Sequence, residues 1–198
     1  MTKSSRFLHV GCGPAGSAPL PEPFHRGSWT EVRLDLDPAH GPDIACSITD
    51  MAPVADASFQ AVYSAHNLEH LAEHEVHAAL SEIRRVLAPG GFALVTVPDI
   101  QAVAQQAALG DLHRVLYVSP AGPVRIIDVL YGFTPAIAEG NTHMRHRTGF
   151  SAACLTTALA RAGFAATFVL RRTERFALTA LACADHCAAP HDIPWWLA

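Results

Sequence analysis

A short apolar segment that stops at a run of glycines is the feature that most constrains the fold of this chain. Residues 7–10 read Phe-Leu-His-Val, and Gly11-Cys-Gly-Pro-Ala-Gly16 follows directly. An apolar run of this length, bounded by glycines, is typical of a buried strand that enters a tight turn. The chain is therefore expected to begin its fold with a strand and a glycine-rich loop at the strand's carboxyl end.

The residues after this loop favour one class of ligand over another. The spacing Gly11-x-Gly13-x-x-Gly16, with acidic residues about twenty positions later, matches the dinucleotide fingerprint. That fingerprint needs a helix directly after the turn, because the free amides of the helix N-terminus hold the phosphates. Prolines at every second position of residues 19–23 exclude a regular helix there. S-adenosylmethionine (SAM) has no phosphate and tolerates such a loop, so the sequence favours SAM over NAD(P) or a purely structural turn.

The rest of the chain alternates apolar strands with helical patterns, which indicates an α/β fold with a mostly parallel sheet. Strands are expected at residues 7–10, 31–37, 43–48, 59–65, 92–97, 164–171 and 175–182, and helices at residues 67–87, 100–109 and 151–162. The last two strands are separated by only three residues and therefore form an antiparallel hairpin. We predict one domain over residues 1–198, because a chain of this length builds a single core.

Residues 101–147 interrupt this regularity. The segment contains repeated prolines and glycines, and loops of such length are usually functional. We expect it to be an insertion that acts as a lid over a substrate pocket. Its apolar stretch at residues 115–137 could also pair two subunits, so a homodimer is an expected form of the protein.

Charge and hydropathy exclude several kinds of partner. The chain has 14 basic and 18 acidic residues, a formal net charge of -4. That balance provides no electrostatic footprint for nucleic acid or for an anionic membrane surface. No charge-free apolar run of about 20 residues is present, so no segment is expected to span a membrane. The first ten residues lack the apolar run of a secretory signal, and we expect a cytoplasmic protein.

Several motifs, in order, resemble the class I SAM-dependent methyltransferases, in particular their small methyltransferase type 11-like domains. The segments that carry the resemblance are Val10–Pro14, Leu34–Pro38, Thr49–Met51, Asp56–Val62, His66–Leu71, Arg85–Gly91 and Ala162–Phe164. It covers roughly residues 6–99 and 148–182, with a truncated first crossover helix. The resemblance implies a Rossmann-like fold, a seven-stranded sheet that ends in an antiparallel hairpin, and SAM as cofactor.

The resemblance also implies which residues hold the cofactor. Asp35 would accept hydrogen bonds from two ribose hydroxyls, as the two oxygens of a carboxylate can. Asp50 would meet the adenine amino group, although a helix-capping or turn role is the alternative, and Met51 is equally well explained as a core residue. The full set of expected cofactor residues is His9, Gly11, Cys12, Gly13, Asp35, Leu36, Asp50, Met51, Ser64 and Ala65.

The run His66-Asn-Leu-Glu69-His70 carries the most chemistry in the sequence. It matches the H-x-x-E-H motif of inverted zincins, but His66 falls at a strand end, so a protease is not expected. On a helix, positions i, i+3 and i+4 share one face. Some methyltransferases of this class bind a divalent metal through a similar spacing, with two acids and a histidine. The resemblance therefore suggests a metal held by His66, Glu69 and His70.

Two alternatives to the metal remain open. Glu69 and His70 could simply order the start of the helix and line the cofactor cavity. Asn67 could cap the helix, which would leave His66 outside it. A further metal ligand would have to come from the insertion, and the candidates are His113, His143 and His146.

The sequence as a whole predicts a SAM-dependent methyltransferase that acts on a small-molecule acceptor. Such an enzyme must align the acceptor in line with the methyl group and remove its proton. His66 and His70 are the candidate general bases, because an unperturbed imidazole titrates near neutral pH. The alternative is a SAM- or nucleotide-binding module that transfers no methyl group and serves regulation or assembly, since a fold does not prove a function.

Overall fold

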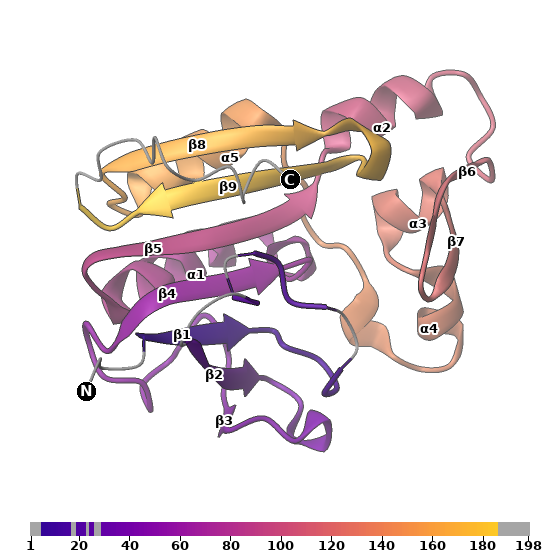
Figure 1. The fold of residues 1–198 in the computed structure, drawn as a ribbon. Coiled ribbons are helices and arrows are strands. Elements are labelled where there is room, and N and C mark those ends of the chain that lie inside the picture. Colours follow the sequence, from indigo (N-terminus) through magenta and orange to yellow (C-terminus); the bar gives the residue numbers. More distant parts are fainter. Residues whose placement is uncertain (1–4, 17–18, 23, 26–28, 186–198) are drawn as a thin grey trace.

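A computed structural model describes residues 5–16, 19–22, 24–25 and 29–185, and the structural statements below concern these residues. Seven strands form one sheet in the order β3-β2-β1-β4-β5-β9-β8. Their bounds are β1 (Ser5–Val10), β2 (Trp29–Asp35), β3 (Ile44–Ala45), β4 (Phe59–Ala65), β5 (Leu87–Pro98), β8 (Ala166–Arg172) and β9 (Ala177–Cys183). Neighbours among β1–β5 are parallel, whereas β9 runs antiparallel to both β5 and β8. The predicted sheet with its terminal hairpin is confirmed (Figure 1).

Helices cover one face of this sheet. α1 (Glu73–Val86) and α5 (Ala152–Arg161) bury Leu80, Ile83, Leu155 and Leu159 in one continuous core, together with side chains of the strands. Apolar residues three and four positions apart form the buried stripe of α1, as the helical periodicity of the sequence predicts.

Aromatic side chains take the place of a helix on the opposite face. Among the described residues between β1 and β2 none is helical, in agreement with the expected truncation of the first crossover. Phe24, from this connection, stacks on Phe7 of β1 with ring centroids 4.1 Å apart. Trp29 and Phe92 pack edge-on and stacked against Phe24. This cluster gives that face of the sheet an apolar cover.

The predicted helix at 67–87 is wrong at its start. A single 3-10 turn, η2 (Leu68–His70), is followed by extended backbone at Leu71, and α1 begins only at Glu73. His66 precedes both, with a left-handed backbone of φ 49°. His66, Glu69 and His70 therefore do not share a face of α1, because His66 precedes η2 and η2 ends before α1 begins.

The insertion packs beyond the carboxyl ends of β4 and β5 (Figure 1). It holds α2 (Ile100–Ala107), the hairpin of β6 (Val115–Ser119) and β7 (Gly122–Arg125), α3 (Ile126–Tyr131), α4 (Thr134–Ala138) and the 3-10 helix η3 (Thr142–Met144). Its own small core contains Val103, Val124, Ile126 and Val129. Val118 and Tyr131 are exposed on it. Pairing of subunits through this surface stays a prediction, as do the single-domain organisation and the closing role of the lid.

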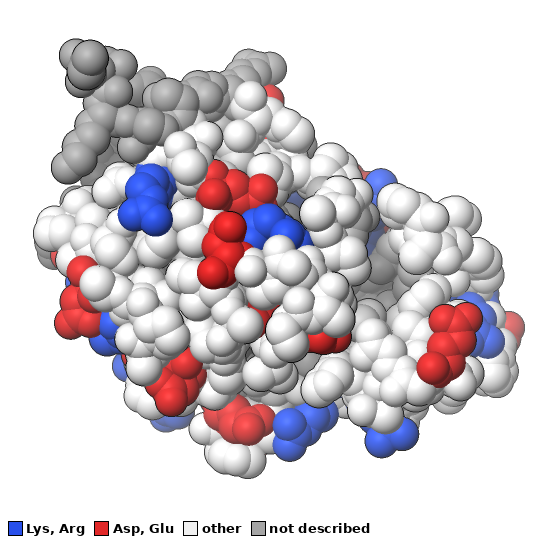
Figure 2. Space-filling view, turned by 90° about the horizontal axis from the view of Figure 1, so that it is seen from below, with Lys and Arg blue, Asp and Glu red and all other residues white. Residues whose placement is uncertain are grey.

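Two surface properties bear on partners. No helix within the described residues is long and apolar enough to cross a membrane. Figure 2 shows acidic and basic side chains interspersed on the face that it displays, without a broad field of one sign.

Candidate functional site

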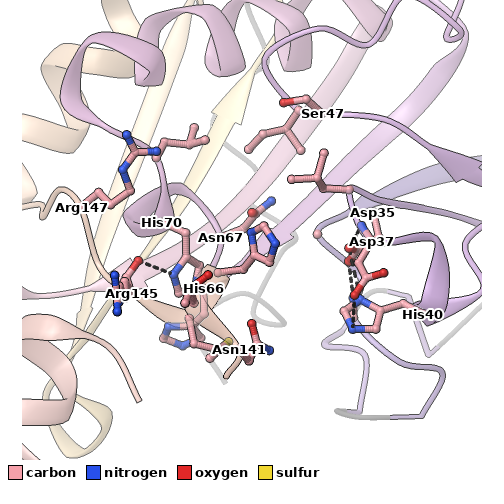
Figure 3. A pocket seen from close by; sticks show the side chains of 18 of the residues that line it. Asp35, Asp37, His40, Ser47, His66, Asn67, His70, Asn141, Arg145 and Arg147 are labelled. Atoms are coloured by element: carbon pink, nitrogen blue, oxygen red, sulfur yellow. Dashed lines mark hydrogen bonds and ion pairs between the residues drawn. The ribbon is translucent and has the colours of Figure 1, made fainter. Parts of the chain in front are cut away.

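A cavity of about 640 Å³ opens at the carboxyl edge of the parallel strands, between the sheet and the insertion. Figure 3 shows two walls: Asp35, Asp37, His40 and Ser47 on one side, and His66, Asn67, His70 with the segment 141–147 on the other. Ligands of open α/β sheets bind at this edge. The volume lies within the range of about 300–1,000 Å³ that is usual for small-molecule sites.

The glycine turn after β1 forms part of this cavity. Gly11 and Gly13 both line it, and both have left-handed backbones, with φ of 64° and 60°. A β-carbon on Gly11 would collide with the side chain of Asn67, the Cγ of which would lie 2.5 Å away. Glycine at position 11 therefore permits both the turn and its close contact with the loop after β4.

Asp35, the last residue of β2, lies at the centre of the first wall and is 9% exposed. Its Oδ2 accepts from the amide of Gly13 at 2.8 Å and its Oδ1 from the amide of Asp37 at 2.9 Å. Burial raises the pKa of this carboxyl group, but the two amides and the nearby His40 lower it by a larger amount. The pKa of Asp35 therefore lies below its ordinary value. Asp35 is thus a preorganised carboxylate.

The two residues expected at the adenine end of the site, Asp50 and Met51, lie outside the cavity lining. β3 stops at Ala45, short of the strand predicted over 43–48, and the following Ser47, Ile48 and Thr49 line the cavity. The amide of Met51 donates to Glu82 Oε2 at 2.6 Å, and Asp50 accepts from the amide of Ala52. Met51 therefore connects this loop to α1, whereas Asp50 closes a local turn.

Four other expected cofactor residues also lie outside the cavity lining, whereas Leu36 is part of it. His9 pairs with Glu31 across β1 and β2, with 2.7 Å between Nδ1 and Oε1, and packs on Tyr63. Burial lowers the pKa of His9 against the opposing effect of Glu31. The remaining three, buried or half-buried at strand ends, are Cys12, Ser64 and Ala65.

His66 and Glu69 form a pair on the second wall. His66 Nδ1 lies 3.2 Å from Glu69 Oε1, and the glutamate side chain is only 1% exposed. Desolvation lowers the pKa of His66, whereas the hydrogen bond and charge of Glu69 raise it, and the net direction is upward. Burial raises the pKa of Glu69, but the hydrogen bond and the charge of His66 lower it by a larger amount. The buried carboxylate therefore orients the imidazole that lines the cavity.

His70 contacts the insertion. Its Nδ1 lies 3.1 Å from the backbone carbonyl of Arg145, and its ring lies against that of His146 with centroids 5.0 Å apart. Burial lowers the pKa of His146, while the charge of Glu69 opposes this effect. The structure thus brings together histidines that are 76 positions apart in the sequence; of the three candidate insertion histidines, it places His146 beside Glu69 and His70.

Some residues in or next to the cavity carry no signal in the sequence. Arg33 donates to the carbonyls of Gly13 and Gly41 and so connects the glycine turn with the loop after β2. His40 and Asn141 line the cavity from short loops. For the part of the cavity wall that the insertion forms, the sequence offers one signal, the concentration of histidines and arginines in residues 143–147.

The comparison with known sequences matches one family. The profile of a methyltransferase domain matches residues 8–95, the part of the chain that holds β1–β5 up to Val95. No curated protein sequence matches the chain.

Solved structures show the same fold at low sequence identity. A complex of the Haloferax volcanii Trm112 methyltransferase activator with a protein described as a methyltransferase gives a TM-score of 0.55 at 17% identity, over 93% of this chain and 84% of that one. A SAM-dependent methyltransferase from Thermotoga maritima gives 0.55 at 13% identity, over 93% and 84%. Phosphoethanolamine N-methyltransferase 2 from Haemonchus contortus, in complex with SAM, gives 0.52 at 17% identity, over 89% of this chain and 36% of that one.

Proposed function

Because residues 8–95 match the methyltransferase domain family and the fold is that of the class I SAM-dependent methyltransferases, we propose that this protein transfers a methyl group from SAM to a small-molecule acceptor. The observation that carries the proposal is the composition of one cavity. The glycine turn and the Asp35 carboxylate line it on one side, and the imidazoles of His66 and His70 line it on the other. Cofactor-binding groups and proton acceptors therefore face a shared space.

The residues present fit the nucleoside half of SAM. Each oxygen of Asp35 already accepts one backbone amide and keeps a further lone pair for a ribose hydroxyl. Leu36 is 58% exposed beside it and offers an apolar surface for a base. Ser47 and Thr49 place hydroxyl groups on the same wall.

A buried amide fits the amino-acid half. The Nδ2 of Asn67 has no hydrogen-bond partner within the described part of the chain, although it is buried and its residue lines the cavity. A buried donor without a partner costs about 1–3 kcal/mol, so a ligand carboxylate that accepts from it would be favoured. When bound, SAM supplies a methyl group that its sulfonium charge activates for transfer.

His66 is the better placed of the two candidate bases. Glu69 accepts from its Nδ1 and leaves Nε2 as the nitrogen that can take a proton from an acceptor hydroxyl or amine. A base whose orientation is fixed by a carboxylate resembles the arrangement of acid-oriented histidines in hydrolases. Residues 141–147 of the insertion would shape the acceptor's side of the cavity and exclude water.

A small acceptor suits the size and charge of this site. The cavity is closed on one side by the insertion, and the chain carries a net charge of -4, which does not favour the backbone of nucleic acid. Polar groups of both signs line the acceptor's side. They include Glu75, His143, Arg145 and Arg147.

The test has two steps. Calorimetry of the purified protein with SAM, with its demethylated product and with NADH is expected to show binding of the first two alone. Incubation with isotope-labelled SAM and a metabolite extract, followed by mass spectrometry, is then expected to reveal a labelled small molecule. His66→Ala should retain SAM affinity and lose roughly 10²–10⁴-fold in rate, the usual contribution of a general base.

The outcomes separate the alternatives. Binding of SAM without any labelled product in extracts or peptide mixtures would favour the SAM-binding module over the enzyme. A rise in the melting temperature of the protein with NADH, and none with SAM, would overturn the proposal. Full activity of His66→Ala would leave methyl transfer in place and remove His66 as its base.

A further inference from the structure

A buried carboxylate with one unused oxygen lies behind the cavity wall. Glu69 is 1% exposed, and its Oε1 is the atom paired with His66. Its Oε2 has no hydrogen-bond partner within the part of the chain that the structure describes. A buried carboxylate oxygen without a partner is costly, so this position calls for a cation or a donor that the protein's own side chains do not provide.

Two imidazoles supply the rest of a ligand set. One nitrogen each of His70 and His146 and one carboxylate oxygen of Glu69 all lie within 4.8 Å of one another. His70 Nδ1 lies 3.1 Å from the carbonyl of Arg145, and His146 Nδ1 lies 2.8 Å from the carbonyl of Val129. A carbonyl only accepts, so both Nδ1 atoms carry the proton and both Nε2 atoms keep a free lone pair.

This hydrogen bonding is the pattern that orients metal-ligating histidines. Such residues usually donate their second ring N–H to a carbonyl or carboxylate, which fixes the tautomer and the ring orientation. In this protein the two donors bind backbone carbonyls of two different segments of the insertion. The rings are therefore held before any ligand arrives.

Backbone contacts fix the position of His146 relative to Glu69. The amides of Arg147 and Thr148 both donate to the carbonyl of Glu69, at 2.8 and 3.2 Å, and the amide of His146 donates to Tyr131. The segment with His146 is thus attached both to the loop that carries the other two ligands and to the end of α3. A preorganised set loses little conformational entropy on binding an ion.

From this geometry we propose that Glu69, His70 and His146 bind one divalent transition-metal ion, at a site distinct from the His66–Glu69–His70 set that the sequence spacing suggests. Two imidazoles and one carboxylate form a ligand set of the zinc, iron and manganese type, and three protein ligands leave coordination positions open. His66 does not belong to this group, and its Nδ1 is paired with Oε1 of Glu69. His113 and His143 are exposed and belong to no such group among the described residues.

The position of this site has two consequences for the cavity. His70 also lines the cavity, so the ion would lie at the cavity wall, where a ligand oxygen or nitrogen can reach an open position. Because His70 belongs to η2 and His146 to the insertion, the ion would also link the loop after β4 to the insertion. The inference goes beyond the proposed function and does not depend on it, because it rests on the ligand geometry alone.

The experiment measures metal binding directly. The full chain, without a polyhistidine tag, is freed of metal with a chelator and titrated with Zn²⁺ by calorimetry and with Co²⁺ by visible absorption. We expect one equivalent per chain and a Co²⁺ spectrum of nitrogen and oxygen ligands. Glu69→Gln and His146→Ala should each weaken affinity by more than about 100-fold, beyond the range for the loss of a supporting contact. His143→Ala, an exposed imidazole of the same segment, is the matched control and should bind as the unchanged protein does.

Each result decides the proposal. Loss of the single equivalent in the two ligand variants, with retention in His143→Ala, supports it. Absence of stoichiometric binding overturns it, and so does equal binding by His146→Ala, which would indicate surface histidines. If circular dichroism shows that His146→Ala is unfolded, the near-isosteric Glu69→Gln and the Co²⁺ spectrum of the unchanged protein decide. SAM calorimetry on the same samples reports separately on the proposed function.

Discussion

The two walls of the cavity are built in different ways. On the sheet side, strand ends and backbone amides hold the carboxylate of Asp35, above a core that runs through β1–β5, α1 and α5. On the insertion side, the wall is a 3-10 turn and extended residues that rest on a small core of four buried aliphatic side chains. The difference indicates that the wall with Asp35 is fixed by the core of the sheet, whereas the wall formed by the insertion depends on a smaller core.

The largest expected effect tests whether the two units are separable. Leu80→Ala and Ile126→Ala each empty a fully buried site, one in the core of the sheet and one in that of the insertion. Each should cost about 2–5 kcal/mol of the stability of the unit that holds it. Hydrogen exchange should show faster exchange throughout β1–β5 for Leu80→Ala, but only within residues 100–147 for Ile126→Ala. Uniformly faster exchange in both variants would mean that the insertion and the sheet unfold as one unit.

The second prediction concerns Asp35, on the sheet side of the cavity. Asp35→Ala removes an acceptor of the proposed ribose contact and should weaken SAM binding by roughly 1–3 kcal/mol, as for hydrogen bonds to a charged group. Calorimetry measures the change. Asp50→Ala is the control. The sequence predicts a cofactor contact for Asp50, but Asp50 does not line the cavity, so this variant should bind SAM as the unchanged protein does. An equal loss of SAM affinity in both variants would support the contact between Asp50 and adenine that the family resemblance implies.

A pH effect follows from the carboxylate that fixes the start of α3. Asp128 is 3% exposed and accepts from the guanidinium of Arg125 and the amide of Thr134. Burial raises the pKa of Asp128, but these donors lower it well below the usual range. Its stabilisation is therefore complete above the unfolded carboxyl pKa of about 3.9 and is lost as the pH falls toward the folded value.

Asp128→Asn should cost about 0.5–2 kcal/mol at neutral pH, similar to the loss of a helix cap. Below about pH 4 the variant should lose less stability with further acidification than the unchanged protein does. Denaturant unfolding at a series of pH values measures both quantities. Glu139→Gln, which alters an exposed acid of the same insertion, is the control. The same acid dependence in Asp128→Asn as in the unchanged protein would assign it to other carboxylates.

The smallest effect concerns the link between the two sides. Arg147 of the insertion pairs with Glu75 of α1 at 3.3 Å, and both side chains are substantially exposed. Arg147→Gln should change the free energy of unfolding by at most about 1 kcal/mol, since exposed ion pairs contribute little. Thermal unfolding at low and high salt checks this value. A clearly larger loss would show that residues 145–148 hold the insertion more through this side chain than through their backbone bonds to Glu69.

The sequence predicts the sheet side of the molecule better than the insertion side. The strand at 59–65 agrees with β4 residue for residue, and the helix expected at 151–162 agrees with α5 within one residue at each end. The helix expected at 67–87 starts six residues too early, because η2 and the extended Leu71 interrupt a stripe of apolar residues that is continuous in the sequence. In the insertion, only α2 among the elements of residues 100–147 is visible from the sequence pattern.

The sequence by itself determined the alternation of strands and helices in the sheet and the glycine turn, because these depend on periodicity and on residues that are near one another in the chain. The position of Asp35 near the end of β2 follows from the family resemblance, since the strand pattern alone extends to residue 37. The tertiary structure decided which side chains meet. It brought His146 to His70 and Glu69 and left His113 and His143 exposed. It also placed Ser47–Thr49 in the lining of the cavity and left Asp50 and Met51 outside it. Contacts between segments so far apart in sequence depend on how the insertion packs on the sheet, which no local pattern encodes.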